Sequence, residues 1–157
     1  LPNKVIVETE IFTFISSIIS QMNSQITDER NVQLFTTYRG NLYDDPNINI
    51  KDLGNLNFTY SSMTRPTVID TLNSFTSGYI ELFGNYPNKD AIKAFDITTD
   101  ISLRLALNKK LIKSFKYGDQ TYIENIYNYA KDSLGGYINN GFYILKHSEY
   151  TVNEIIN

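Results

Sequence analysis

Two aspartates and an arginine, each four residues from the next, are the side chains of this sequence best spaced for acid–base chemistry. Asp96, Asp100 and Arg104 would share one face of a helix, where two carboxylates could exchange protons with a bound molecule. The same spacing also fits a surface ion pair between Asp100 and Arg104, with Asp96 capping or bracing a neighbouring loop. We favour this second interpretation, which gives the three side chains a structural role.

Few other residues could supply chemistry. The 157-residue chain has no cysteine and a single histidine, His147, which excludes disulfides, thiolate metal sites, a cysteine nucleophile and any site that needs two histidines. No Gly-x-Ser-x-Gly turn accompanies His147, so we do not expect it to be catalytic. Asp44 and Asp45 lie among asparagines but lack the spacing and the final glutamate of a calcium loop, and we expect a solvated loop there.

The mild acidity of the chain gives no electrostatic reason to expect a nucleic-acid or anionic-membrane partner. The formal net charge is −3, and the small lysine cluster at 109–116 fits a solvated amphipathic turn better than a phosphate-binding surface. Neither the P-loop nor the Gly-x-Gly-x-x-Gly pattern occurs, so we expect no nucleotide cofactor and no metal. The longest apolar stretch, around Ile15–Ile19, is interrupted by serines and is far shorter than a membrane span of about 20 residues.

The elements that would position these residues are those of an α/β fold. Apolar spacing predicts a strand at Lys4–Val7, a helix carrying Ile11 to Met22, and strands at Val32–Thr37 and Leu56–Ser61. The first three elements would form a β-α-β unit with a parallel strand pair. Turn-forming residues place a long loop between Tyr38 and Gly54, with one helical turn around Ile50–Leu53.

The second half of the chain is expected to begin with helices and end with strands. One helix should start at Pro66, carry Val68, Leu72, Phe75, Tyr79 and Leu82, and stop at Gly84–Pro87, and a second should be capped by Asn88. Residues 109–116 would extend or follow that second helix. Tyr122–Ala130, Tyr137–Lys146 and Tyr150–Ile156 read as strands, the last two forming an antiparallel hairpin. We therefore predict one domain over 1–157: a mainly parallel sheet flanked by helices, with C-terminal antiparallel strands.

A longer pattern in the chain is similar to a known family. The segment Phe75-x-x-x-Tyr79-x-x-x-Phe83-Gly84-x-Tyr86-Pro87-x-x-x-Ala91-x-x-x-Phe95-Asp96 resembles the type 1 periplasmic-binding fold of leucine/isoleucine/valine-binding proteins and receptor ligand-binding domains. Gly135-Gly136-Tyr137 and Phe142-Tyr143-Ile144-Leu145 are also similar to the C-terminal lobe of that family. The resemblance covers nearly the whole chain and is nearest to Bacteroidetes proteins in which such a region follows LysM peptidoglycan-binding repeats.

The resemblance implies a non-catalytic lobe, a fragment of a longer chain, that closes with a missing N-terminal lobe on a small, amino-acid-like solute in the periplasm or cell envelope. By position it implies that the residues after the parallel strands face the cleft: Glu8, Thr9, Thr37, Tyr38, Arg39 and Ser61. Tyr38-Arg39-Gly40 replaces the family's Gly-rich, glutamate-bearing turn, which leaves amino-acid specificity open. The alternative is a ligand-free scaffold or regulator of peptidoglycan metabolism that holds a protein or glycan, and an enzyme using Asp96, Asp100 or His147 ranks third.

Overall fold

The computed structural model describes residues 3–66 and 73–155, and the chain divides into two compact units. Unit 1 joins Leu1–Ser62 to Tyr143–Asn157, and unit 2 is the insertion Met63–Phe142 between them. A single α/β lobe was expected from the sequence, and this division was not. The assignment of the whole chain to one lobe of a longer protein stays a prediction.

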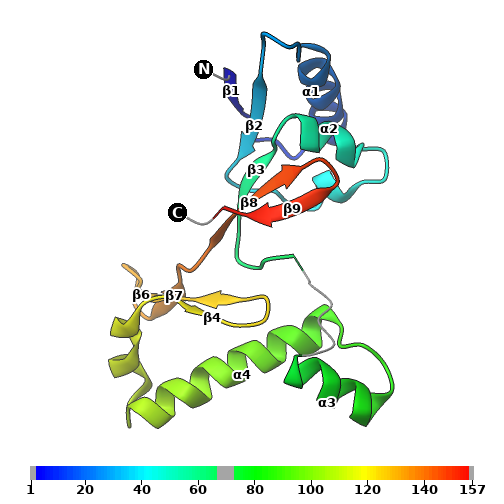
Figure 1. The fold of residues 1–157 in the computed structure, drawn as a ribbon. Coiled ribbons are helices and arrows are strands. Elements are labelled where there is room, and N and C mark those ends of the chain that lie inside the picture. The colour runs from blue at the N-terminus through cyan, green and yellow to red at the C-terminus, as the bar shows by residue number, and fades with distance from the viewer. Residues whose placement is uncertain (1–2, 67–72, 156–157) are drawn as a thin grey trace. The chain divides into compact units, whose positions relative to one another are not determined.

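Unit 1 is built on one five-stranded sheet in the order β1-β2-β3-β8-β9 (Figure 1). The strands β1, β2 and β3 are parallel, and β8 and β9 form an antiparallel hairpin beside β3. Their bounds are β1 Asn3–Ile6, β2 Val32–Thr36, β3 Thr59–Ser62, β8 Tyr143–Ser148 and β9 Thr151–Glu154. The predicted α/β class, with a parallel sheet and C-terminal antiparallel strands, is confirmed.

Helix α1 (Phe12–Ser24) connects β1 to β2 and buries Ile15, Ile19 and Met22, as its apolar spacing predicts. The loop after β2 contains a 3-10 turn, η1 (Leu42–Asp44), and the short helix α2 (Ile50–Asn55), which Asn49 caps. Phe58, Leu34, Leu53 and Leu56 are fully buried and form the centre of the core of unit 1. Burial of such side chains supplies most of the stabilisation of a small sheet domain.

The described residues of unit 2, 63–66 and 73–142, form two helices, a 3-10 segment and two small antiparallel strand pairs. The elements are α3 Ser74–Phe83, α4 Lys89–Leu107, η2 Leu111–Tyr117, β4 Gln120–Thr121, β5 Ile126–Tyr127, β6 Tyr129–Lys131 and β7 Tyr137–Asn139. Both predicted helix boundaries around residues 84–88 are confirmed. Gly84 ends α3 with a φ of +70°, and the Asn88 side chain caps α4 by accepting from Ala91 N at 2.8 Å.

Two expectations for this half of the chain need correction. Helix α3 begins at Ser74 and not at Pro66. Asn73 has an extended backbone conformation, and its side-chain oxygen Oδ1 accepts a hydrogen bond from Phe75 N, so Asn73 caps the helix. Val68 and Leu72 lie outside the described residues. The C-terminal hairpin forms from β8 and β9, but Tyr137–Asn139 is separate from β8 and pairs with β6.

The predicted ion pair between Asp100 and Arg104 forms, but its predicted place on the surface is wrong. Asp96 and Asp100 are fully buried and Arg104 is nearly so. The Asp96 carboxylate accepts from the backbone N–H groups of Ile123, Glu124 and Asn125 and from Asn125 Nδ2, at 2.9 to 3.1 Å. The expectation that Asp96 braces a neighbouring loop is therefore confirmed.

Asp100 and Arg104 complete the network. Asp100 accepts from Arg104 Nε at 2.8 Å and from the hydroxyls of Tyr122 and Tyr129. Arg104 donates to the carbonyl oxygens of Ser114 and Tyr127. Asp100 and Arg104 thus form a hydrogen-bonded ion pair, and Asp96 accepts four N–H hydrogen bonds. Such partners are the condition under which charged side chains can be buried.

Candidate functional site

The carboxyl ends of the three parallel strands are joined by side-chain hydrogen bonds. Glu8, after β1, accepts from Thr37 N at 2.5 Å and from Thr36 Oγ1 at 3.2 Å. Ser61, at the end of β3, donates to Thr37 O at 2.8 Å. The hydrogen bond from the Thr37 backbone lowers the pKa of Glu8, so its carboxylate is held ionised at this edge.

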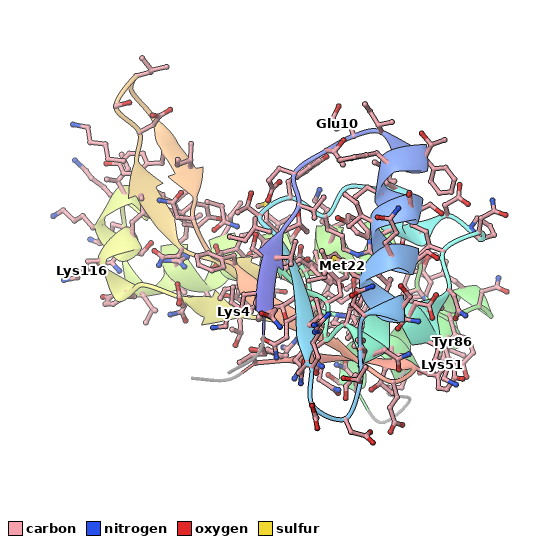
Figure 2. The ribbon with its side chains drawn as sticks, turned by 90° about the horizontal axis from the view of Figure 1, so that it is seen from above. Lys4, Glu10, Met22, Lys51, Tyr86 and Lys116 are labelled. Atoms are coloured by element: carbon pink, nitrogen blue, oxygen red, sulfur yellow. The ribbon has the colours of Figure 1, made fainter. Side chains whose placement is uncertain are left out.

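A cavity of about 480 Å³ opens at the same edge of unit 1. Its volume is within the range of about 300 to 1,000 Å³ that is typical of small-molecule sites. It is lined by the turn after β1 and by the loop after β2: Thr9, Glu10, Phe12, Tyr38, Arg39, Gly40, Asn41, Leu42, Asp44 and Asp45. Figure 2 shows Glu10 in the turn that leads from β1 into α1. The position of the cavity matches the rule that ligands of α/β proteins bind at the carboxyl ends of the sheet strands.

The structure divides the six residues that the sequence analysis selected. Thr9, Tyr38 and Arg39 line the cavity. Glu8, Thr37 and Ser61 are not among the lining residues and instead bond the ends of the strands to one another. Their role in the geometry is to fix the backbone from which Tyr38 and Arg39 project.

Arg39 is held in place by the loop that follows it. Its two terminal nitrogens donate to the Asp44 carboxylate at 2.8 and 2.5 Å, and its guanidinium lies 5.2 Å from the centre of the Tyr60 ring. The hydrogen bond to Asp44 raises the pKa of Arg39 further. The Nε–H group of Arg39 is buried and has no hydrogen-bond partner among the described residues.

Negative charge predominates among the lining residues. Glu10, Asp44 and Asp45 stand against the single positive charge of Arg39, which Asp44 already pairs. Asp45 accepts from the backbone and side-chain nitrogens of Asn47, which orders the turn. A cavity with excess carboxylates and the exposed ring of Tyr38 attracts cationic groups, ammonium groups included.

The loop residues that line the cavity were not predicted as site residues from the sequence. Asp44 and Asp45 were expected in a solvated loop, and Glu10, Phe12 and the 40–42 turn were not selected for the site. The available signal was the dense run of turn-forming residues directly after a buried strand, which is where loops carry function. Among the described residues, no cluster of three or more acidic or histidine side chains could hold a metal ion.

His147 lies away from the cavity lining, in the core of unit 1. Its ring packs against Phe58 and Tyr60, with centroid distances of 5.5 and 5.9 Å. Burial lowers the pKa of His147 to about 4, and the nearby charge of Arg39 adds to the effect. That His147 is not catalytic stays a prediction, and in this geometry its ring is a packing element.

Comparison with known proteins gives one likeness, and it is a likeness of fold. No family model matches the chain, and no curated protein matches its sequence. A solved structure of an ABC transporter substrate-binding protein from Desulfitobacterium hafniense, in complex with Leu, matches 98% of this chain with a TM-score of 0.50 and 12% identity. The chain spans 43% of that protein's length.

No helix in the described part of the chain has the length and apolar character needed to span a membrane. The residue pattern that resembled periplasmic-binding proteins and the matched backbone lead to the same fold. The chain has a periplasmic-binding-protein-like α/β fold, shared with a substrate-binding protein.

Proposed function

We propose that this chain is the solute-recognition part of a longer, extracytoplasmic substrate-binding protein. The observation that carries the proposal is the cavity at the carboxyl ends of β1 and β2, where aromatic and charged side chains surround about 480 Å³. The shared fold with a Leu-bound protein supports the same role. On this proposal the chain binds its solute without catalysing a reaction.

The charges of the cavity favour an amino-acid-like solute held by its ammonium group. Glu10 and Asp45 carry carboxylates that no ion pair neutralises within the described residues, and Tyr38 offers a ring face beside them. Arg39 is engaged by Asp44, so it orders the loop more than it offers a free positive charge to a carboxylate. The α-carboxylate of the solute would therefore be bound by the part of the complete protein outside residues 1–157.

The proposal is tested by thermal unfolding of the complete protein with each of the twenty free amino acids at 10 mM. A solute present at 100 times its dissociation constant stabilises the native state by about 2.7 kcal/mol, which raises the melting temperature by several degrees. We expect at least one amino acid to do this. The 157-residue chain alone should show no such stabilisation, because it would carry only the ammonium half of the site.

Two results would contradict the proposal. If no amino acid shifts the melting temperature while peptidoglycan fragments do, the chain is a wall-associated scaffold of the kind that follows LysM repeats. If the 157-residue chain is stabilised as strongly as the complete protein, the division of the site between two parts of the protein is wrong.

A further inference from the structure

The cavity of unit 1 has two walls, which come from different segments of the chain. The first wall is the turn after β1, with Thr9, Glu10 and Phe12. The second wall is the loop after β2, which lines the cavity between Tyr38 and Asp45. Both walls belong to unit 1, so the shape of the cavity depends on how far apart this unit holds them.

The backbone hydrogen bonds between β1 and β2 end where the two walls begin. Val7 N donates to Phe35 O at 2.9 Å, and in a regular parallel ladder the N–H group of Thr37 would donate next, to the carbonyl of Val7. Thr37 N instead donates to Oε1 of Glu8 at 2.5 Å. A side chain therefore takes the place of the backbone at the point where the two segments separate.

Glu8 is placed to connect the two walls. It directly precedes Thr9 of the first wall, and Thr37 directly precedes Tyr38 of the second. The same Oε1 atom also lies 3.2 Å from the hydroxyl of Thr36. The hydrogen bond from the Thr37 backbone lowers the pKa of Glu8, so the acceptor at neutral pH is a carboxylate, which holds an N–H group more strongly than a neutral oxygen does.

Thr36 extends this connection to the backbone of Tyr38. Its hydroxyl oxygen lies 3.3 Å from Tyr38 N and 3.0 Å from Tyr38 O. A hydroxyl has one proton to donate, and the charged carboxylate of Glu8 attracts it more strongly than the carbonyl of Tyr38 does. Because Thr36 Oγ1 can then accept from Tyr38 N, one chain of hydrogen bonds runs from Glu8 through Thr36 to Tyr38.

Glu8 itself is not among the residues that line the cavity. We propose that Glu8 is a positioning residue of the solute site, whose carboxylate holds the two walls at a fixed separation and fixes the backbone of Tyr38. The groups of a binding site have to be held within about 0.5 Å of their productive positions, so a change in this separation weakens binding. The effect on binding rests on the proposed function, whereas the connection between the walls does not.

The family resemblance implied another role for Glu8, in which its side chain faces the cleft and meets the solute. The two roles differ in whether the negative charge is needed. A carboxylate that attracts an ammonium group loses this attraction when it is replaced by a neutral amide. A positioning oxygen keeps its function, because Oε1 of a glutamine can accept from Thr37 N and from the Thr36 hydroxyl in the same geometry. Glu8→Gln therefore separates the two roles, and Glu8→Ala removes both.

The test uses Glu8→Ala and Glu8→Gln, with Glu29→Ala as the matched control. Glu29 carries the same charge, also in unit 1, and is exposed in the segment that leads into β2, at the other end of that strand. The first measurement is the amide spectrum of the 157-residue chain by nuclear magnetic resonance, without any solute. The second is calorimetric titration of the complete protein with the free amino acid that raises its melting temperature most.

We expect Glu8→Ala to move the amide signals of both walls and to weaken binding about tenfold, as the loss of a supporting contact does at other sites. Glu8→Gln should shift mainly the Thr37 amide proton, because its neutral oxygen is a weaker acceptor, and should bind within about threefold of the wild type. Glu29→Ala should change neither the walls nor the affinity. All three variants should melt within a few degrees of the wild type, since both glutamates are exposed.

Three results would overturn the inference. Unmoved amide signals of the two walls in Glu8→Ala would show that the carboxylate does not hold them. An equal loss of affinity in Glu8→Ala and Glu8→Gln would make Glu8 a direct contact of the solute through its charge. A large fall in the melting temperature of Glu8→Ala, with amide signals moving throughout unit 1, would make Glu8 a residue of general stability.

This test can fail separately from the test of the proposed function. If no amino acid binds the wild-type protein, the proposed function is wrong, and the amide signals of the two walls alone decide whether Glu8 positions them. If an amino acid binds the wild type and Glu8→Ala equally well, the solute site stands and the positioning role of Glu8 is wrong.

Discussion

The only histidine of the chain is buried without a hydrogen-bond partner for either ring nitrogen among the described residues. His147 packs between aromatic rings, and Arg39 and Asp44 are the charged side chains near enough to influence it. Burial and Arg39 both disfavour the imidazolium, while Asp44 favours it. The native state therefore holds the ring neutral.

This residue predicts how stability depends on pH. The pKa of His147 is about 4 in the native state and 6.5 as a reference, so between these values the unfolded chain binds a proton that the native chain does not. The free energy of unfolding is unaffected by His147 above pH 6.5 and decreases as the pH falls from 6.5 toward 4. We expect a loss of about 2 kcal/mol between pH 7 and pH 5 from this side chain.

Urea unfolding at both pH values measures the effect, with His147→Phe as the comparison because it keeps a flat ring and removes the titration. The wild-type chain should lose about 2 kcal/mol more than the variant over this interval. Identical pH dependence in the two proteins would show that the ring is not desolvated as the structure has it.

At the same scale, sequence reasoning found the right side chains on α4 and misjudged where they lie. The spacing of Asp96, Asp100 and Arg104 is local information, and it correctly indicated one helical face. The burial of Asp96 depends on the backbone N–H groups of Ile123 to Asn125, 27 to 29 residues further along the chain. No local pattern contains that contact.

Among the elements of unit 1, α2 and the β8–β9 turn approach each other closely at Gly54. A Cβ atom at Gly54 would lie 2.1 Å from the carbonyl oxygen of Glu149, which is part of the turn. Glycine is therefore required here by the approach of two backbones. The hairpin and α2 belong to the two separate chain segments that make up unit 1, so this contact helps hold the segments together.

Gly54→Ala should destabilise unit 1 by about 2 kcal/mol, because the backbone of Glu149 has to move to make room for the methyl group. Gly78→Ala is the matched control, since Gly78 lies inside α3 with no atom within 4 Å of the Cβ position. That change should stabilise by about 0.5 to 1 kcal/mol, the difference in helix propensity. Chemical denaturation measures both, and a neutral Gly54→Ala would contradict the close approach.

Element positions that depend on local chemistry were predictable. The asparagine cap at Asn88 and the glycine stop at Gly84 are short-range signals, and both are confirmed. The partner of Tyr137–Asn139 was not predictable in the same way, because β-strands choose among distant partners by packing. The cap at Asn73 was not predicted, because Pro66 is also a residue at which a helix can begin and was chosen as the start.

For the molecule as a whole, unit 1 is built from two chain segments and unit 2 is inserted between them in the sequence. Unit 1 is completed by residues that follow an insertion of 80 residues, Met63–Phe142. No internal repeat or low-complexity linker marks either junction in the sequence, so the division depends on contacts between distant segments. The same limit applied to the site. The strand ends were predicted from their position, whereas the loop after β2, which lines most of the cavity, was identified only from the folded structure.

The measurement that tests the central claim most directly is calorimetric titration of the complete protein with the amino acid that stabilises it most. Tyr38 lines the cavity and is 69% exposed, so Tyr38→Ala should weaken binding at least tenfold and leave the melting temperature within a few degrees. Tyr150 is equally exposed in the β8–β9 turn, away from the cavity lining, and Tyr150→Ala should bind as the wild type does. Unchanged affinity in Tyr38→Ala, or an equal loss in both variants, would contradict the site.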